Sequence, residues 1–585
     1  MALLKEVMIR PGVVKDTTAL DVEARWVDTD KIRWVRGRPQ PIGGWTKFNE
    51  NAFLGKARGL LAWLDNSGVS RLAVGTNMRL YVAQGVNLVN ITPAAASGNL
   101  TDPFTTTSGL TAVTVTDTAH GLVAGQYVNF DGASAVGGIT IDGDYVVATV
   151  PTADSYTIAH SSAASSSASG GGTVAYVYDL AFGRVDAVNG AGWGVGTYGS
   201  GTWGTARSTS IILPPRVWSI DQWGPYILAL PTEGNLYEWV NNTNLRAALV
   251  TNAPTDSLAM FVTAEKHVVL LGAGGSRMLV QWCDQDDNTT WTPASTNTAG
   301  SRTLTGGSRL FFGIRTERTN LVFADRSVWA MTFVGGQDVF GFDLIAGAAA
   351  GIVGPHGATE MAGVVYWMGQ ENFFLFNGTI RLIPNAANIV RYVFDRLNRT
   401  QSTKVYCGVN SAFTEIWWLY PSTDGVEVDS YVMVNIVNFE WAVGSLARSA
   451  VVDKDLFDYP LMAGTDGYLY QHEDGADADG SALGETLTTS PLPQIRDGTR
   501  MMEIFSVIPD FSNLDGALNV TVITRSYPQS TAEEVSFGNI SSTTEKVDGA
   551  AQGREVSLKF TGSVTRTQPW RMGTIHVEIE RGGER

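Results

Sequence analysis

The densest group of side chains able to do chemistry follows Trp282 and contains Asp284, Asp286, Asp287 and Asn288. Carboxylates at alternate positions of a short loop can bind calcium, which prefers about six to eight oxygen ligands. The loop lacks the glycine and the terminal glutamate of an EF-hand. We therefore favour turn capping by these carboxylates, and cation binding by Asp284, Asp286 and Asp287 stays open as the alternative.

The remaining candidate residues are weaker. Asp142 and Asp144 are compatible with similar ligand chemistry, but an Asp-Gly turn also accounts for them. The six histidines are dispersed in strands and Gly turns, where we expect structural roles: His120, His160, His267, His356, His472 and His576. No zinc-protease, nucleophile-elbow, P-loop or Asp-box pattern occurs. We accordingly predict no catalytic, cofactor-binding or metal-binding residue, and we expect the chain not to be an enzyme.

The composition favours β structure and argues against several classes of protein. The 585 residues include 64 glycines and only 17% charged residues, which is typical of many short strands joined by turns. A net charge of -16 opposes adhesion to nucleic acid through a broad basic face. Cys283 and Cys407 are too few for a disulfide framework or a structural zinc site. We expect no cofactor, no signal peptide and no membrane span.

A hairpin pattern recurs along the chain, and Ser257–Pro293 holds one complete copy of it. The second strand of each hairpin opens on an apolar pair, and seven such pairs can be aligned: Leu80/Tyr81, Leu236/Tyr237, Met278/Leu279, Val328/Trp329, Phe373/Phe374, Val432/Met433 and Leu469/Tyr470. Most of them recur about every 40 to 60 residues, the range of four-stranded propeller blades. We predict an all-β protein with a β-propeller of about seven blades.

Departures from the repeat define the other predicted parts of the chain. The boundaries are an N-terminal extended arm at 1–55, the propeller at 56–103 and 181–475, an inserted small β module at 104–180, and a C-terminal β-sandwich-like domain at 476–585. The last domain begins with a polar linker and continues in four strands of period two.

Three local features carry further expectations. The arm interleaves Trp26, Trp34 and Trp45 with basic residues, for which interface packing and base stacking are the alternatives. A Gly-rich loop with Trp193, Tyr198 and Trp203 follows the module and is expected to be exposed. One amphipathic helix is predicted over 384–399, packing on the propeller or contacting a partner.

Three segments resemble the tail nozzle or hub proteins of short-tailed bacteriophages, also called packaged-DNA stabilisation or tail tubular B-type proteins: IRPGVVKDTTALDVEARWVDTDKIRWVRGRPQPIGGW, RMLVQWCDQDDNTTWTP and YPLMAGTDGYLYQHEDG. The resemblance spans most of residues 9–475. It implies a homohexameric tube in the virion tail, assembled in the host cytoplasm, that retains packaged double-stranded DNA and conducts it during ejection without sequence specificity. It also implies contacts with the adaptor or head-to-tail connector ring and with tail fibre or needle proteins.

A second class of function is an adhesin. In this alternative the protein is a carbohydrate-binding or depolymerising tail adhesin, and the inserted module or Trp193 and Trp203 face the host surface. Aromatic faces stack on sugars, and they also pack at subunit interfaces, so these residue types fit both classes.

Overall fold

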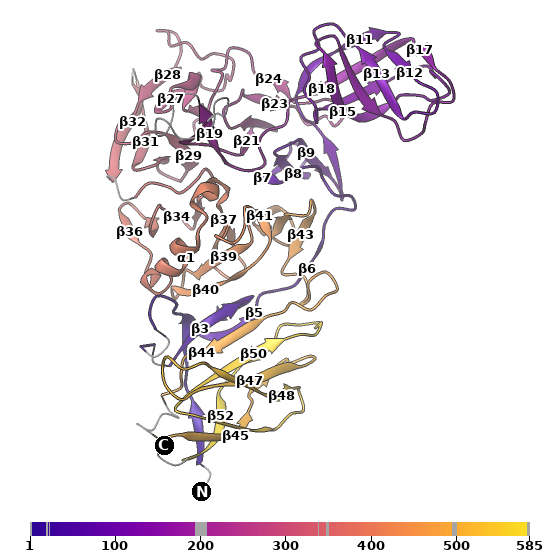
Figure 1. The fold of residues 1–585 in the computed structure, drawn as a ribbon. Coiled ribbons are helices and arrows are strands. Elements are labelled where there is room, and N and C mark those ends of the chain that lie inside the picture. The colour runs from indigo at the N-terminus through magenta and orange to yellow at the C-terminus, as the bar shows by residue number, and fades with distance from the viewer. Residues whose placement is uncertain are drawn as a thin grey trace.

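The computed structural model describes residues 3–18, 21–22, 24–192, 207–336, 338–346, 350–493 and 500–581. Their strands form a propeller in the middle of the molecule, a sandwich at the end that holds both termini, and a small barrel beside the propeller (Figure 1). The expected fold class is confirmed: the protein is all-β, with a propeller, an inserted β module and a C-terminal sandwich-like domain.

Seven antiparallel four-stranded sheets are the propeller blades. Their innermost strands are β7 (Ala57–Leu64), β21 (Trp218–Trp223), β25 (Ala259–Val262), β29 (Leu310–Arg315), β33 (Ala358–Met361), β37 (Tyr406–Asn410) and β41 (Arg448–Val452). The second strands are β8 (Ser70–Thr76), β22 (Tyr226–Pro231), β26 (Val268–Leu271), β30 (Asn320–Ala324), β34 (Val364–Met368), β38 (Glu415–Tyr420) and β42 (Leu461–Gly464). Because β7 contacts both β21 and β41, the ring of inner strands closes.

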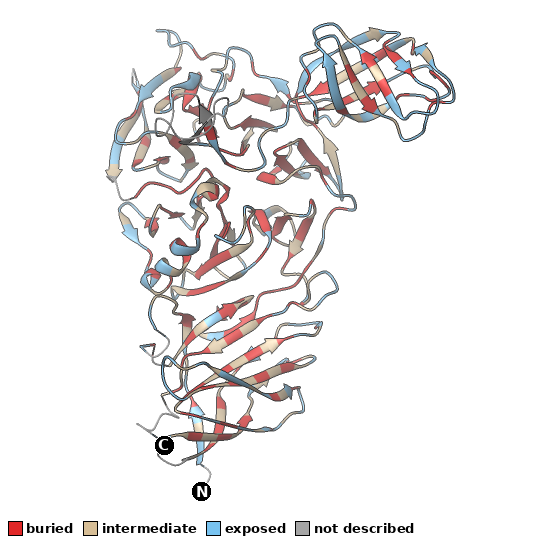
Figure 2. Ribbon diagram, in the orientation of Figure 1, coloured by how far each residue is buried: buried red, intermediate tan, exposed pale blue. Residues whose placement is uncertain are grey.

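The outer half of each blade follows the predicted repeat. The third strands are β9 (Leu80–Gln84), β23 (Tyr237–Trp239), β27 (Leu279–Trp282), β31 (Val328–Gly335), β35 (Phe373–Phe376), β39 (Ser430–Asn435) and β43 (Leu469–His472). The outermost strands are β10 (Asn87–Asn90), β24 (Ala248–Leu249), β28 (Gly300–Thr303), β32 (Val339–Ala346), β36 (Ile380–Leu382), β40 (Glu440–Ser445) and, in the seventh blade, β6 (Trp45–Lys47). All seven aligned apolar pairs begin within a third strand or directly before one. The second strands are the most buried strands of the blades, and buried segments are red in Figure 2.

The N-terminal segment closes the propeller ring. β6 pairs antiparallel with β43, with Trp45 opposite His472, and the two rings stack with centroids 5.1 Å apart. The seventh blade therefore combines strands from both ends of the propeller sequence. This arrangement fixes the ring without leaving the third strand of that blade as a free edge.

The inserted module is a near-closed barrel. Its strands, in sheet order, are β11 (Ala94–Thr101), β18 (Thr173–Asp179), β14 (Tyr127–Asp131), β15 (Gly143–Thr152), β16 (Ser155–Ala159), β13 (Ala112–Thr116), β12 (Phe104–Thr106) and β17 (Ala168–Gly170). The barrel begins with β11, ahead of the expected start at Phe104. The sequence does not predict β11, because this strand is mostly exposed and its small side chains show no alternation of apolar residues. Arg79 of the first blade holds the barrel through ion pairs to Asp144, at 2.9 Å, and to Asp179, at 2.8 Å.

The sandwich combines both ends of the chain. One sheet contains β1 (Leu3–Val7), β52 (Ile575–Arg581), β45 (Met502–Ile508) and β49 (Val547–Gly553). The other contains β2 (Arg10–Val13), β3 (Arg25–Asp30), β44 (Thr486–Thr489), β50 (Glu555–Gly562), β47 (Leu518–Arg525) and β48 (Glu533–Ile540). Two short hairpin-like pairs complete it: β4 (Ile32–Val35) with β5 (Arg38–Pro41), and β46 (Phe511–Ser512) with β51 (Arg571–Met572).

The predicted extended arm at 1–55 is corrected by this pairing. β3 lies between β2 and β44 within one sheet, and Trp26, Trp34 and Trp45 are all buried in the chain's own core. Trp34 donates its indole N–H to the carbonyl oxygen of Trp441 in the sixth blade, at 2.9 Å. These tryptophans thus join the sandwich to the propeller, and neither base stacking nor contact with another subunit is available to them.

The helical content is small, as expected. The predicted helix at 384–399 is one α-helix, α1 (Val390–Arg396), between the 3-10 turns η2 (Ala386–Asn388) and η3 (Arg399–Lys404). It packs on the propeller through buried Val393 and Phe394. Two further 3-10 turns are η1 (Ala273–Gly275) and η4 (Lys454–Leu456). None of the helices in the described ranges has the length and apolarity needed to cross a membrane.

Candidate functional site

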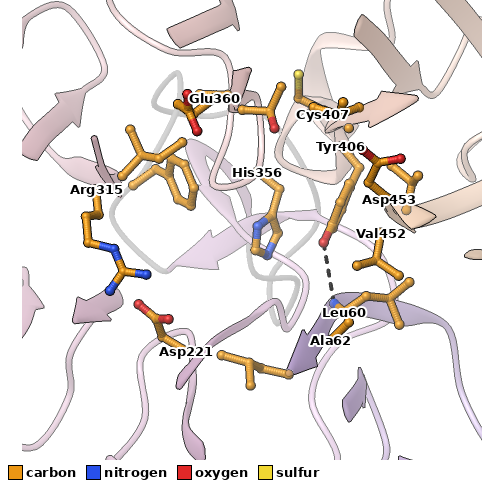
Figure 3. A pocket seen from close by; sticks show the side chains of 18 of the residues that line it. Leu60, Ala62, Asp221, Arg315, His356, Glu360, Tyr406, Cys407, Val452 and Asp453 are labelled. Atoms are coloured by element: carbon orange, nitrogen blue, oxygen red, sulfur yellow. Dashed lines mark hydrogen bonds between the residues drawn. The ribbon is translucent and has the colours of Figure 1, made fainter. Parts of the chain in front are cut away.

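A cavity of about 780 Å³ lies on the propeller axis, where side chains from all seven inner strands meet. Seven blades arranged in a ring leave space at the centre that their inner strands do not fill. Convergent polar groups in such a hollow make it the default site for a small ligand. Figure 3 shows its lining, with His356 in the middle of the view.

His356, Tyr406 and Trp218 close one end of the cavity. The His356 imidazole stacks on the Tyr406 ring with centroids 4.7 Å apart, and its Nε2 lies 3.0 Å from the carbonyl oxygen of Trp218. The Tyr406 hydroxyl oxygen accepts a hydrogen bond of 3.4 Å from the amide of Leu60, drawn as the dashed line in Figure 3. The fifth blade is thereby tied to the second through His356 and Trp218, and the sixth to the first through Tyr406 and Leu60.

Two ion pairs lie beside this closed end, each between a buried cation and a partly exposed carboxylate. Arg58 pairs with Glu427 at 2.5 Å, and Lys404, whose side chain is fully buried, pairs with Asp186 at 2.6 Å. Asp186 lies in the segment that leads from the barrel to the hairpin of β19 (Val188–Gly192) and β20 (Arg207–Leu213). These contacts lie behind His356, at the end of the cavity opposite to Glu360 and Asp453.

Asp221 and Arg315 lie on one wall of the cavity. The Asp221 carboxylate accepts hydrogen bonds of 2.8 Å from the backbone amides of Val262 and Gln222. Burial raises the pKa of Asp221 above its usual range, although these hydrogen bonds and the charge of Arg315 oppose the rise. Arg315 and Asp221 point toward each other in Figure 3. A carboxyl group in this environment keeps its proton to a higher pH than an exposed aspartate does.

Further carboxylates line the cavity. Glu360 accepts a hydrogen bond of 2.6 Å from the amide of Gly363, and Asp453 accepts one of 2.8 Å from the amide of Lys454. Asp455 follows in the same turn and also lines the cavity. These contacts hold the side chains at the ends of inner strands. Two or more carboxyl groups around one cavity are the groups that glycoside hydrolysis requires.

The ionisation of His356, at the closed end of the cavity, makes the stability of the protein depend on pH. Burial lowers the pKa of His356 from its usual 6.5 to about 4, so the folded protein holds a neutral imidazole where the unfolded chain would be protonated. His356 therefore contributes stability above about pH 6.5, and this contribution is lost as the pH falls toward 4. The wild type should lose about 3 kcal/mol of unfolding free energy to His356 as the pH falls from 6.5 to 4, and His356→Gln should not show this loss.

Chemical denaturation at several pH values measures this slope. The barrel variant His160→Gln is the control, since its half-buried ring lies outside the propeller axis. An unchanged slope in His356→Gln would contradict the assignment of the acid sensitivity to this residue.

The acidic residues singled out from the sequence do not join the cavity. Asp284 accepts hydrogen bonds from the amide and hydroxyl of Thr298, at 2.8 and 2.6 Å. Asp287 accepts from Thr289 and Thr290, and Asp286 pairs with Lys266 at 3.0 Å. Over the described ranges, no three His, Cys, Asp or Glu side chains are grouped as metal ligands. The contacts are those of turn capping.

The other sequence candidates are distributed over the fold. Asp142 accepts from the amide of Ala133 within the barrel, and Asp144 takes part in the barrel contact with Arg79. Of the six histidines only His356 lines the axial cavity. Cys283 and Cys407 are buried free thiols. Trp193, Tyr198 and Trp203 lie outside the described residues.

Sequence reasoning missed Asp221, Arg315, Glu360 and Asp453. The repeat was aligned on the second and third strands, whereas these residues belong to the first strand or to the turn after it. All four residues lie in the segment that precedes an aligned hairpin, where the repeat places the first strand of each blade. Polar residues in those segments are the signal in the sequence.

No protein-family model and no curated protein matches the sequence. Among solved structures, the chain is similar to the phage phi92 endosialidase, with 11% identity and a TM-score of 0.19 over 72% of this chain and 64% of that one. It is also similar to virginiamycin B lyase from Staphylococcus aureus, with 8% identity and a TM-score of 0.26 over 44% and 93% of the two chains. A glycoside hydrolase family 43 arabinoxylan arabinofuranohydrolase from Bacillus subtilis gives 8% identity and a TM-score of 0.20 over 63% and 79%.

These neighbours correct one expectation. The chain was expected not to be an enzyme, and that expectation is contradicted because proteins with glycosidase titles are among the matched structures. The match spans less than two thirds of the endosialidase's length. At these TM-scores the likeness assigns no substrate and no reaction to this chain.

Proposed function

We propose that the chain is a bacteriophage tail protein that binds a carbohydrate in the axial cavity of its propeller. The observation that carries the binding function is the cavity itself, which is closed at the His356 end and lined by Asp221, Glu360 and Asp453. Carboxylates accept hydrogen bonds from sugar hydroxyls, and the aromatic floor supplies apolar contact to a sugar ring. The assignment to a phage tail rests on the sequence resemblance.

A panel of bacterial surface polysaccharides tests this function. Binding to the full-length protein is measured by calorimetry, and the release of reducing ends in the same samples reports cleavage. We expect at least one polysaccharide to bind. Cleavage, if it accompanies binding, is expected to depend on Asp221, because a carboxyl group with a raised pKa is suited to protonate a glycosidic oxygen. A panel without any binding would contradict the proposal.

A nozzle or hub subunit is the second candidate, and one structural observation favours it. The N-terminal strands tie the sandwich and propeller into one column (Figure 1), for example through the hydrogen bond of 2.8 Å from the Thr29 hydroxyl to the carbonyl oxygen of Val443. Because the closed end blocks the propeller axis, a DNA conduit would have to form between copies of the chain. Rigid columns with exposed apolar residues such as Leu3 and Leu4 suit a ring of this kind.

Electron micrographs of the purified full-length protein test the second candidate. In this role the protein forms hollow six-fold rings that engage the connector ring and the tail fibre or needle proteins. Monomers at every concentration used would contradict it. The carbohydrate proposal does not depend on this outcome, since the cavity is complete within one chain.

A further inference from the structure

The axial cavity is lined by more acidic than basic groups. Its lining contains four carboxylates, Asp221, Glu360, Asp453 and Asp455, and one guanidinium, Arg315. The remaining basic group, His356, is held neutral by burial at any pH well above 4. Arg315 faces Asp221, so the other three carboxylates have no counterpart among the groups that line the cavity. Over the described ranges, no Lys or Arg forms an ion pair with Glu360, Asp453 or Asp455.

The shape of the cavity limits which part of a glycan it can accept. His356, Tyr406 and Trp218 close one end, and behind them the buried Lys404 ammonium pairs with the partly exposed carboxylate of Asp186. A polymer cannot pass through such an end, so only a chain terminus can enter. The carboxylates of Glu360 and Asp453 lie at the ends of their strands, toward the open side.

Charge then selects among possible termini. Like charges within a few ångströms repel and opposite charges attract, and both effects are stronger in a cavity than in open water. An anionic sugar therefore meets repulsion from the carboxylates, whereas an ammonium finds several acceptors. A neutral sugar is neither repelled nor attracted by the charges of the carboxylates.

We propose that the axial cavity selects a glycan terminus that carries a free amine, with the ammonium bound by Glu360 and Asp453 and the sugar ring lying toward Tyr406 and His356. The inference rests on the proposed carbohydrate-binding function and names the substrate class of that site. Acidic polysaccharides are excluded from the cavity by the same charges.

Four monosaccharide probes test the inference on the full-length protein: glucosamine, N-acetylglucosamine, glucose and glucuronic acid. Saturation-transfer NMR and calorimetry at pH 6.5 and low ionic strength give the affinities. We expect glucosamine to bind about tenfold more tightly than N-acetylglucosamine, with glucuronic acid the weakest. The preference should decrease as salt is added, because ions screen charges near the open end.

Substitutions locate the effect. Glu360→Gln combined with Asp453→Asn should abolish the preference for glucosamine while keeping one hydrogen-bond acceptor at each position. The matched control is Glu371→Gln, which removes an exposed carboxylate outside the cavity and should leave all four affinities unchanged. Thermal unfolding confirms that each variant is folded, and the salt dependence of the wild type gives a second readout that needs no variant.

Each outcome decides a different claim. Binding of the probes without preference, or with glucuronic acid tightest, would overturn the amine selectivity and leave carbohydrate binding in place. A preference that persists in the double variant would also overturn the inference. If none of the four probes binds, both the inference and the assignment of carbohydrate binding to the axial cavity fail.

Discussion

Replacing Arg33 by methionine is expected to lower the free energy of unfolding by about 3–5 kcal/mol. Its guanidinium is fully buried and lies between Glu415, with Nε 3.2 Å from the carboxylate, and Glu473, with contacts of 2.7 and 2.5 Å. Without Arg33 these carboxylates keep only hydrogen bonds to neutral donors. The ion pairs that are lost connect the N-terminal segment to the sixth and seventh blades.

Chemical denaturation of the wild type and the variant measures this effect. Arg38→Ala is the control, because Arg38 is exposed and should change stability by less than about 1 kcal/mol. Burial raises the pKa of Glu415 to about 7, with Glu473 adding to the rise and Arg33 opposing it. Glu415→Gln should therefore reduce the cost of losing Arg33. Equal stability of wild type and Arg33→Met would show that this ion-pair network does not hold the blades.

Deletion of residues 1–50 is expected to abolish a soluble, cooperatively folding protein. It removes three strands from the two sheets of the sandwich and β6 from the seventh blade. The exposed edge of β43 and the open sandwich core would then favour aggregation. Deletion of residues 1–8 is the matched control, because it removes only the edge strand β1 and leaves the propeller ring closed.

Solubility and thermal unfolding of the two deletions distinguish internal strands from an assembly arm. An arm that served only contacts between subunits would leave a folded monomer after deletion of residues 1–50. A soluble protein with the wild-type unfolding temperature would thus contradict the structural role that we assign to these strands. The shorter deletion is expected to unfold cooperatively.

The strands that could be predicted are those buried on both sides. Val268–Leu271, followed by a Gly-rich turn, is one of seven such hairpins, and in each the sequence carries a continuous apolar run. The inner strand of the second blade lacks this signal because its second half lines the cavity. Trp218–Trp223 is buried only in its first residues, and its Asp221 and Gln222 resemble a loop when they are considered alone.

The other elements that the sequence did not predict depend on strand pairing between residues far apart in the chain. Thr486–Thr489 lies in a stretch whose polar composition predicts a linker, yet it is a central strand between β3 and β50. The side chains of Asp221, Glu360 and Asp453 line one cavity only because seven blades close into a ring. No local spacing contains that information, so the cavity follows from the fold and not from a motif.

Binding of surface polysaccharide to the cavity-filling variant Ala62→Trp tests the central claim most directly. Ala62 lines the axial cavity (Figure 3), and an indole there occupies the space that a sugar would need. Val86→Trp adds the same bulk at an exposed turn of the same blade. Calorimetry is expected to show binding by the wild type and Val86→Trp, and its loss by more than about tenfold in folded Ala62→Trp. Undiminished binding by Ala62→Trp would contradict the claim that the cavity is the site.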